Sequence, residues 1–398
     1  NAATNIAFPL SIACTAISLL LGIGAASNFS LHLGAGEEKK AVEYAGTGLC
    51  LMAICGIALF LVTTLFLTPM LKFFGATPDV LPYAEEYTRI TAIGFPFLIA
   101  NTGISKLILA DGSPRYSMTS MLAGAIVNTI LDPLFIFIFQ WGIQGAAWAT
   151  VLSQTIALCM QAHLFSRPTE LLHFRRGIYR LRLDIVRQCI AIGMSPFLMN
   201  SCACLVVLVV NRRLLDYGGD MAIGAYGIVN RVVFLFITVV FGLVQGMQPI
   251  VGYNWGARKD HRAWAVLRLT IAWATLVTVS AMIIGEFFPA NVIHIFGAGE
   301  ELTEKAVRAY RIIVSMFPLV GAQIVMGNFF QSIGHAAKSI FLSVTRQLLF
   351  LVPSLALLPH WWGLDGVWLS MPLSDSVSFF TACGMMWYLV IRLRKKHA

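Results

Sequence analysis

Apolar residues occupy long uninterrupted stretches of this chain, separated by short polar segments. Each stretch holds about 20 residues or more, enough for an α-helix to cross a hydrocarbon layer of about 30 Å. Strands of a membrane barrel would be about half as long and would alternate between apolar and polar residues. The pattern predicts eleven membrane-spanning helices, at roughly 7–33, 42–68, 87–110, 115–139, 143–165, 187–211, 222–250, 263–288, 309–333, 337–358 and 364–391.

The composition agrees with this prediction. Of the 398 residues, 58% are apolar and 12% are charged, whereas a soluble domain carries about 25% charged residues. We therefore expect an all-α integral membrane protein with many spans. The net charge of +9 could suggest a nucleic-acid partner, but the excess lies in short loops beside helix ends. The charge asymmetry of membranes explains it better, so we expect membrane lipid and no nucleic acid around this protein.

Positive charge alternates between successive loops. One set of loops is rich in Lys and Arg, and the positive-inside rule places that set in the cytoplasm. It contains Lys39, Lys40, Arg115, Arg167, Arg175, Arg176, Arg180, Arg182, Arg258, Lys259, Arg262, Lys338, Arg392, Arg394, Lys395 and Lys396. The opposite set carries Asp79, Glu85, Glu86, Asp220, Glu300, Glu301 and Glu304. We therefore expect a cytoplasmic C-terminus and a basic cytoplasmic linker at residues 166–186.

The two halves of the chain repeat each other. Short motifs of the first half recur 222 residues later, and after the fourth predicted span the separation becomes 221. The matches are Gly24 with Gly246, Gly34-Ala35 with Gly256-Ala257, Phe74-Gly75-Ala76 with Phe296-Gly297-Ala298, Arg89-Ile90 with Arg311-Ile312, Phe95-Pro96 with Phe317-Pro318, Gly112 with Gly334, Ser117 with Ser339, and Trp141-Gly142 and Gly145 with Trp362-Gly363 and Gly366. The chain is a tandem duplication.

The repeat predicts the domain organisation. Shifted back by the same separation, the span near residue 187 would begin about 35 residues before Asn1, so we expect one further helix there. Twelve helices would then form two six-helix bundles, and an even number of helices per half makes the bundles parallel. We expect an N-terminal bundle at 1–165 with helices 2–6, the linker at 166–186, and a C-terminal bundle at 187–398 with helices 7–12.

A carboxylate lies in the middle of the apolar segment from Met118 to Phe139. Asp132 at such a depth costs about 2.5–3.5 kcal/mol on insertion scales, so an acid of this kind is normally paired, protonated or in contact with water. Asn128 precedes it by four residues, on the same helical face. Pro133 lacks an N–H group and should disturb the helix beside the acid. Asp132 and Asn128 form a candidate site for a proton or cation, and the alternative is a structural acid that stabilises a bent helix.

Several other polar and flexible side chains interrupt the spans of the second half. Candidates for lining a substrate cleft are Asn200, Gln245, Gln248, Met194 and Met199. Amides in a membrane also form hydrogen bonds between helices, and Met fills gaps in a core, so packing is the alternative for each of them. Asp375 lies within the last span, where a structural role is favoured over a role as a second proton relay.

Five motifs in this order and spacing resemble the multidrug and toxic compound extrusion (MATE) family of transporters, over the whole chain. They are Leu109-Ala-Asp-Gly-Ser-Pro-Arg-Tyr-Ser117, Asn128-x-x-x-Asp132-Pro-Leu, Gly142-x-x-Gly145-Ala-Ala-x-Ala-Thr150, Ala225-Tyr-Gly-Ile-Val-Asn-Arg231 and Gln248-Pro-Ile-Val-Gly-Tyr-Asn-Trp-Gly-Ala257. The resemblance is to the DinF-like and MepA-like prokaryotic branch. It implies the twelve-helix MATE/MOP-type fold and antiport of small organic cations and amphipathic drugs across the cell membrane.

The resemblance also implies a coupling site. In this branch the site comprises an Asp of the first helix, an Asn-x-x-x-Asp pair of the fifth and a Thr of the sixth, which here are Asn128, Asp132 and Thr150, with the first-helix Asp expected before Asn1. Oxygen ligands of this kind suit Na⁺ as well as H⁺, so the coupling ion stays open. The acids of other branches are absent from residues 196–204 and 317–327.

Other functions remain as alternatives. The first is a lipid-linked oligosaccharide flippase of the same superfamily. A membrane-embedded enzyme would need a nucleophile or a metal cluster, and the eight Cys and eight His show no metal-ligand spacing. We expect no enzymatic activity, no metal and no cofactor other than the coupling ion, and a monomer in the membrane.

Overall fold

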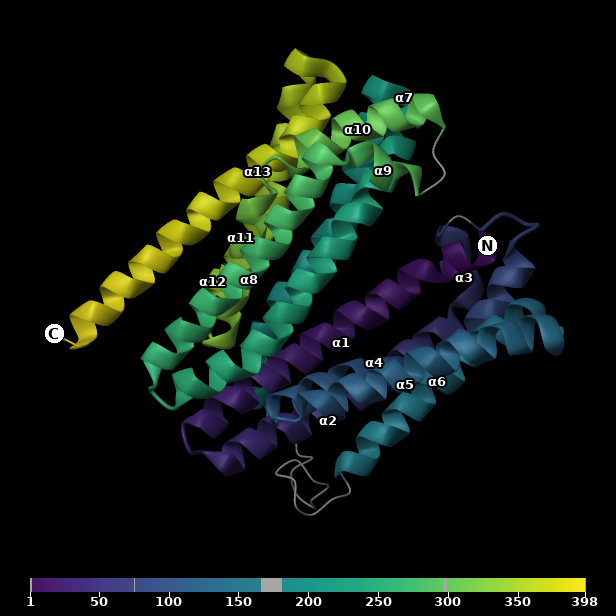
Figure 1. Ribbon diagram of the computed structural model, residues 1–398. Helices are drawn as coiled ribbons and strands as arrows, with labels where there is room; N and C mark the ends of the chain where they lie inside the picture. The colour runs from purple at the N-terminus through teal and green to yellow at the C-terminus, as the bar shows by residue number, and fades with distance from the viewer. Residues whose placement is uncertain (1, 75, 166–180, 296–298, 398) are drawn as a thin grey trace. The chain divides into compact units, whose positions relative to one another are not determined.

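The computed structural model describes residues 2–74, 76–165, 181–295 and 299–397 of the protein, and within these ranges every regular element is a helix (Figure 1). The helices of the first half are α1 (Ala2–Gly34), α2 (Glu38–Leu65), α3 (Leu67–Phe73), α4 (Leu81–Ala110), α5 (Pro114–Pro133), the π-helix η1 (Leu134–Ile138) and α6 (Gly142–Phe165). Those that follow are α7 (Leu183–Gly256), α8 (Asp260–Phe287), α9 (Pro289–His294), α10 (Glu300–Val314), α11 (Phe317–Ser332), α12 (Ala336–Val344), the π-helix η2 (Thr345–Leu351) and α13 (Val352–His397). The expectation of an all-α protein is confirmed.

The two longest helical segments each contain two spans. Helix α7 has 74 residues, which at about 1.5 Å per residue is more than three times the thickness of a hydrocarbon layer. It breaks at Gly219, where φ is 66°, and α13 breaks at Gly363, where φ is 53°. Both angles lie in the left-handed region that glycine adopts without strain. The breaks are neighbours, because the Tyr217 hydroxyl lies 3.0 Å from Nδ1 of His360.

The number of spans agrees with the sequence. In the described ranges, eight helices are long and apolar enough to cross a membrane, and the bent pair α10 and α11 adds a ninth. Dividing α7 at Gly219 and the segment 336–393 at Gly363 gives the eleven spans that the apolar runs predict.

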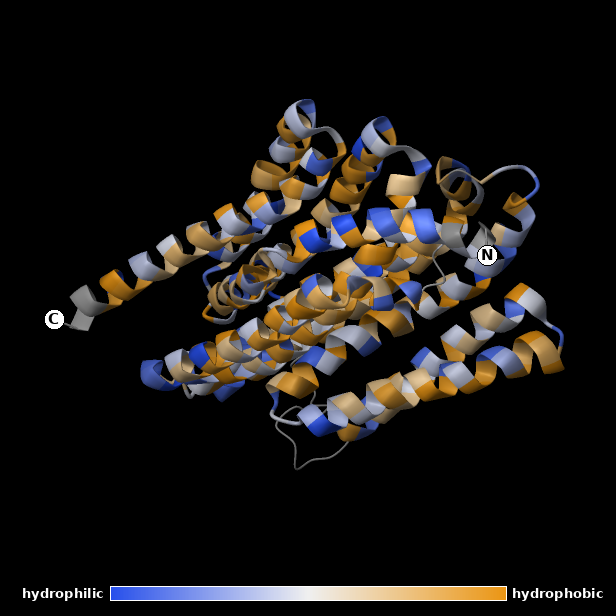
Figure 2. Cartoon of the chain, turned by 45° about the horizontal axis from the view of Figure 1, so that its top comes forward, coloured by the Kyte–Doolittle hydropathy of each residue, from blue (hydrophilic) through white to orange (hydrophobic). Residues whose placement is uncertain are grey.

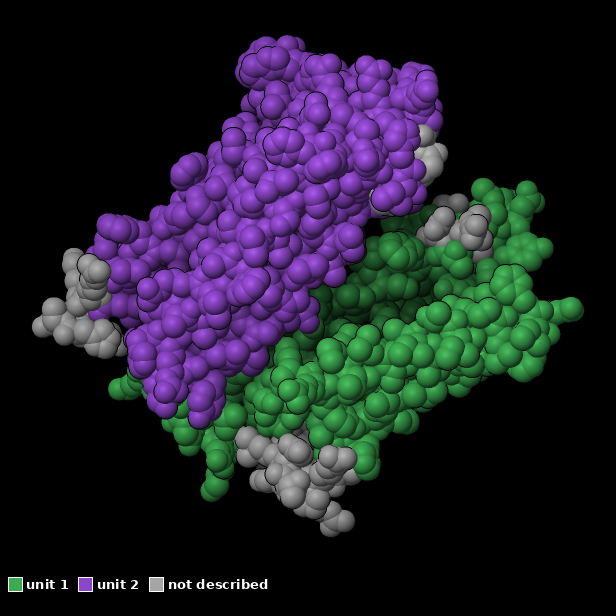
Figure 3. Space-filling view, in the orientation of Figure 1, with its two compact units in different colours: residues 1–197, 256–258 green, residues 198–255, 259–398 purple. Residues whose placement is uncertain are grey.

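The chain forms two compact units, coloured separately in Figure 3. Unit 1 contains residues 1–197 and 256–258, and unit 2 contains residues 198–255 and 259–398. The predicted linker falls largely on residues 166–180, which lie outside the described ranges. The bundle boundaries given above stay a prediction.

Unit 1 is held together by close approach of helix backbones. Helix α1 packs against α2 and α4, and α6 packs against α4 and α5. Gly22 lies so near Gly103 of α4 that a Cβ atom added to it would come within 2.7 Å of the Gly103 Cα. Small residues permit this approach, and in lipid, where apolar burial contributes little to helix association, close packing has to supply the stability.

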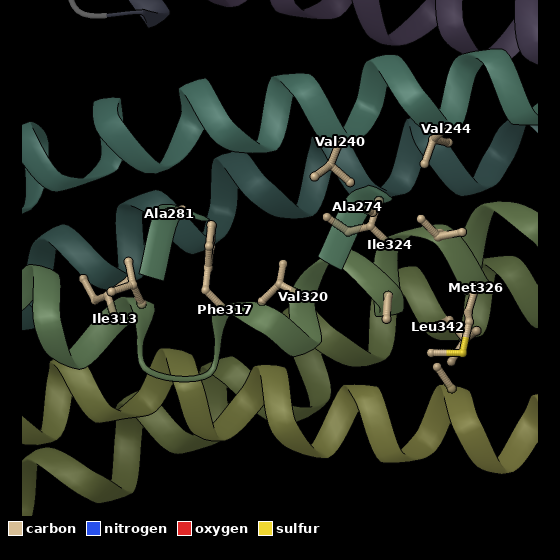
Figure 4. Close-up of a cluster of buried hydrophobic side chains, with 14 of the residues drawn as sticks. Val240, Val244, Ala274, Ala281, Ile313, Phe317, Val320, Ile324, Met326 and Leu342 are labelled. Carbon is tan, nitrogen blue, oxygen red and sulfur yellow. The ribbon is translucent and has the colours of Figure 1, made fainter. Parts of the chain in front are cut away.

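Unit 2 has a continuous apolar core, part of which is drawn in Figure 4. Helix α11 packs against α8 and α13. Phe329 of α11 is fully buried, and its ring lies 6.1 Å from the ring of Trp255 and 5.3 Å from that of Trp264. In Figure 4, Val240 of α7 lies beside Ala274 of α8 and Ile324 of α11.

The outer surfaces of both units are apolar, as lipid requires. Hydrophobic residues run along the long helices in Figure 2. Large apolar side chains are exposed on many helices, among them Phe137 at 73%, Leu208 at 67% and Phe234 at 67%. A soluble protein would not leave so much apolar surface in water. The expected multi-pass membrane protein is confirmed.

Candidate functional site

The predicted pair Asn128 and Asp132 lies one helical turn apart near the end of α5, and both side chains are half-buried. Within the described ranges, neither side chain forms a hydrogen bond or an ion pair, and none joins the two. Asp132 is therefore a carboxylate without a counter-charge in the described structure, which is the condition that bound H⁺ or Na⁺ would relieve.

The backbone beside Asp132 departs from the α-helix. Helix α5 ends at Pro133, the π-helix η1 begins at Leu134, and the Leu134 N–H group donates to the Leu131 carbonyl. Pro133 has no N–H group to donate to the Thr129 carbonyl. The disturbance predicted beside the acid is confirmed, and its form is a π-helix, a conformation that is frequent at functional sites.

Thr150 lies on α6, the helix that packs against α5. Its hydroxyl donates to the Ala146 carbonyl over 3.0 Å. This bond uses the hydroxyl proton and leaves the oxygen lone pairs free to accept or to coordinate. The described structure contains no hydrogen bond from Thr150 to Asn128 or Asp132.

The five cleft candidates lie along α7 and are all half-buried. Met194 belongs to unit 1, and Met199, Asn200, Gln245 and Gln248 belong to unit 2. The Gln248 amide donates to Oδ1 of Asn328 on α11 over 3.0 Å. This bond matches the interhelical alternative for Gln248, and the role of the five residues in substrate binding stays a prediction.

A buried polar network in unit 1 was not predicted from the sequence. The Gln161 amide donates to Oδ1 of Asn101 over 2.8 Å and to the hydroxyl of Ser120 over 3.3 Å, and Asn101 donates to Gln154 over 2.7 Å. These bonds connect α4, α5 and α6. The signal was present, because amides within apolar spans need partners in a membrane.

A buried ion pair in unit 2 was also missed. Nε of Arg346, in η2, donates to Oδ1 of Asp375, in α13, over 2.8 Å. The sequence indicates Asp375 as an acid within the last span, and its partner Arg346 lies in the span before it. A cation within an apolar run is a strong signal for a paired acid. The pair lines a cavity of about 230 Å³.

Comparisons with known proteins identify the family. The MatE family model matches residues 2–134 and 191–355. The multidrug export protein MepA of Staphylococcus haemolyticus is 25% identical over 395 residues, which cover 98% of this chain and 86% of that protein, and MepA of Staphylococcus aureus is 25% identical over 391 residues with the same coverage.

Solved structures show the same fold. A crystal structure of MATE in the bent conformation superposes with a TM-score of 0.94 at 22% identity, over 99% of this chain and 88% of that one. An outward-facing multidrug resistance MATE family transporter of the MOP superfamily gives a TM-score of 0.90 at 22% identity, over 99% and 87%. The predicted MATE/MOP-type fold is confirmed.

Because the family model spans most of the chain, membership also confirms that the protein is not an enzyme. The chain belongs to the MATE family of transporters.

Proposed function

We propose that this protein is a secondary active antiporter that exports amphipathic organic cations and drugs across the cell membrane, driven by H⁺ or Na⁺ bound at Asp132. The likeness to multidrug export proteins over 98% of the chain supports the substrate class. The observation that carries the coupling proposal is the half-buried Asp132 carboxylate, which has no ion pair within the described ranges.

Electrostatics gives Asp132 its role. An uncompensated carboxylate at this depth costs about 2.5–3.5 kcal/mol, and binding of H⁺ or Na⁺ removes most of that cost. Asn128 and Thr150 supply uncharged oxygen atoms of the kind that hard cations prefer. The Thr129 carbonyl, to which Pro133 cannot donate, is a further acceptor beside the acid.

Coupling requires the ion and the substrate to bind different conformations with different affinities. Ion entry from outside onto Asp132 would favour release of the substrate outward, and ion loss to the cytoplasm would reset the transporter. Our candidates for the substrate-lining residues are Asn200, Gln245, Gln248, Met194 and Met199. The two Met side chains can adapt to varied apolar molecules. The basic loops support a cytoplasmic C-terminus, and we expect a monomer.

The test measures efflux of ethidium, a fluorescent lipophilic cation, from proteoliposomes. A pH gradient and a Na⁺ gradient are imposed separately on the wild type and on Asp132→Asn. Asp184→Asn is the matched control, since Asp184 is also an acid of unit 1 but is 58% exposed and paired with Arg182. We expect flux that follows one gradient in the wild type and the control and vanishes in Asp132→Asn.

Two outcomes would contradict the proposal. Full gradient-driven flux in Asp132→Asn would show that Asp132 is not part of the coupling site, while the export function would stand. Flux under neither gradient in the wild type would argue against antiport of this cargo and favour the lipid-linked oligosaccharide flippase. A reporter fused to the C-terminus, active on only one side of the membrane, tests the orientation.

A further inference from the structure

Arg346 is a cation held inside the membrane-spanning part of unit 2. It lies in the π-helix η2, and its Nε donates to Oδ1 of Asp375 over 2.8 Å. The side chains of Arg346 and Asp375 are 27% and 11% exposed. The Ser374 hydroxyl donates to the Arg346 carbonyl over 2.8 Å, which fixes the backbone of η2 against α13. Asp375 therefore holds the guanidinium group, and Ser374 holds the backbone of the same residue.

The pair leaves most of the hydrogen-bonding capacity of Arg346 unused. A guanidinium carries five N–H donors in a planar fork, and Asp375 accepts from only the one on Nε. Among the residues that the structure describes, none accepts a hydrogen bond from the two terminal nitrogens. The Arg346 side chain is 27% exposed, and two adjacent N–H groups of a guanidinium fit the two oxygens of a carboxylate.

Arg346 lines a cavity of about 230 Å³ built by α7, α10, α11, η2 and α13. Its walls are mostly apolar and include Val206, Val229, Ile313, Phe317 and Met371. This volume is below the roughly 300–1,000 Å³ of sites for drug-sized ligands, so the occupant has the size of one or two rings.

Uncharged polar groups accompany Arg346 at the cavity. Tyr226, Asn230 and Gln347 also line it, and none of these three side chains forms a hydrogen bond to a described residue. The walls thus offer several donors, one cation and an apolar surface. Asp375 also lines the cavity and neutralises the charge of Arg346, so a monoanion meets less repulsion there than a phosphate dianion.

We propose that this cavity binds a monocarboxylate with an apolar body. The carboxylate accepts two hydrogen bonds from the terminal nitrogens of Arg346, and the body packs between Val229 and Phe317. The site goes beyond the proposed export function, because it lies wholly within unit 2, does not involve Asp132, and takes a ligand opposite in charge to the organic cations.

The test is calorimetric binding to the purified full chain in micelles, and it needs no transport. The probes are 1-naphthoate, 1-naphthamide and 1-naphthylmethylammonium, which share a ring system and differ in charge. We expect naphthoate to bind at least about tenfold tighter than either of the others, as a charge-assisted bidentate contact requires. Equal affinities for the three probes, or no binding of naphthoate, would refute the proposal.

Variants locate the binding. Arg346→Gln should weaken naphthoate at least about tenfold, and Asp375→Asn should strengthen it by removing the competing carboxylate. Arg308→Gln is the control, since Arg308 forms an ion pair with Asp365 in the same unit but is 69% exposed. Thermal unfolding shows whether Arg346→Gln is folded. If it is folded and binds naphthoate as tightly as the wild type, the proposal is contradicted. If it does not fold, the comparison of the three probes on the wild type decides alone.

The same carboxylate chemistry could come from water or from the membrane. Laurate is therefore titrated in competition with naphthoate. Displacement by laurate at lower concentration than naphthoate assigns the site to lipid-derived acids, and the reverse order assigns it to water-soluble aromatic acids. Both results keep Arg346 as the carboxylate ligand.

Discussion

Gly145 and Gly366 occupy the same place in the two halves of the chain. Each lies three residues after a glycine of positive φ, Gly142 at 56° and Gly363 at 53°. In both halves the helix that starts there passes the backbone of the preceding segment. A Cβ atom on Gly145 would lie 2.9 Å from the carbonyl carbon of Phe135, and one on Gly366 would lie 2.6 Å from the carbonyl carbon of Leu358. Alanine at either position should therefore destabilise its hairpin.

The structure sets the size of the effect. To reach the 3.4 Å of ordinary contact, the new methyl group must move by at least about 0.8 Å in Gly366→Ala, where the Leu358 carbonyl oxygen is nearer still, and by about 0.5 Å in Gly145→Ala. Overpacking costs about 1–3 kcal/mol, and alanine regains about 0.5–1 kcal/mol of helix stability. We expect a net loss of about 1–2 kcal/mol for Gly366→Ala and of about 0–1 kcal/mol for Gly145→Ala.

Gly384 provides the control, because nothing lies within 4 Å of a Cβ atom added there. Gly384→Ala should be neutral or stabilise by about 0.5–1 kcal/mol. The assay is equilibrium unfolding of the three variants and the wild type in mixed micelles with increasing sodium dodecyl sulfate, followed by tryptophan fluorescence. If Gly366→Ala proved as stable as Gly384→Ala, the reasoning from backbone proximity would be wrong.

Two further predictions concern charged groups. Arg346→Met should destabilise unit 2 by about 3–5 kcal/mol, because it leaves the Asp375 carboxylate buried without its partner. In the same unfolding assay, the double variant Arg346→Met with Asp375→Leu should recover most of that loss. A double variant as unstable as Arg346→Met alone would contradict this. Glu37, between α1 and α2, accepts hydrogen bonds from His32 and Lys40. These two bonds, that from His32 first, hold the pKa of the Glu37 carboxyl below its ordinary value. Since the folded state lowers this pKa, the stabilisation is present above the ordinary glutamate value of about 4.3 and is lost as pH falls through the lower folded value. The melting temperature of the wild type should thus converge on that of Glu37→Gln as pH is lowered from 6 to 3, and a constant difference across this range would refute the role of Glu37.

The fold was largely predictable because the membrane restricts what a chain can do. A run of 20 or so apolar residues has few options besides a spanning helix. The break at Gly363 is visible as well, since Trp362-Gly363 repeats the Trp141-Gly142 that lies between two runs of the first half. The apolar pattern does not show where the backbone hydrogen bonds change from the α-helical to the π-helical pattern. The π-helix η2, which lies just before Pro353, has no composition that distinguishes it from an α-helix.

The candidate site was only partly accessible from the sequence. Asp132 and Asn128 stand out because a carboxylate and an amide four residues apart are rare in apolar runs. Arg346 was missed because its partner Asp375 is 29 residues away, on the next span, and pairing across helices depends on how they pack. Asn101 and Gln161 are 60 residues apart, so their bond was hidden for the same reason.

The two π-helices bear on how the halves diverged. The separation between matching residues is 222 from Gly24 to Ser117 and 221 from Trp141 onward, so one half has gained or lost a residue in the interval between them, which contains η1 in one copy and η2 in the other. In a regular α-helix a single insertion turns every later residue by about 100° and would exchange lipid-facing and core-facing positions. A π-turn accommodates the extra residue locally. These segments are therefore where the duplicated gene could tolerate a codon insertion or deletion and still encode the same packing on both sides of it.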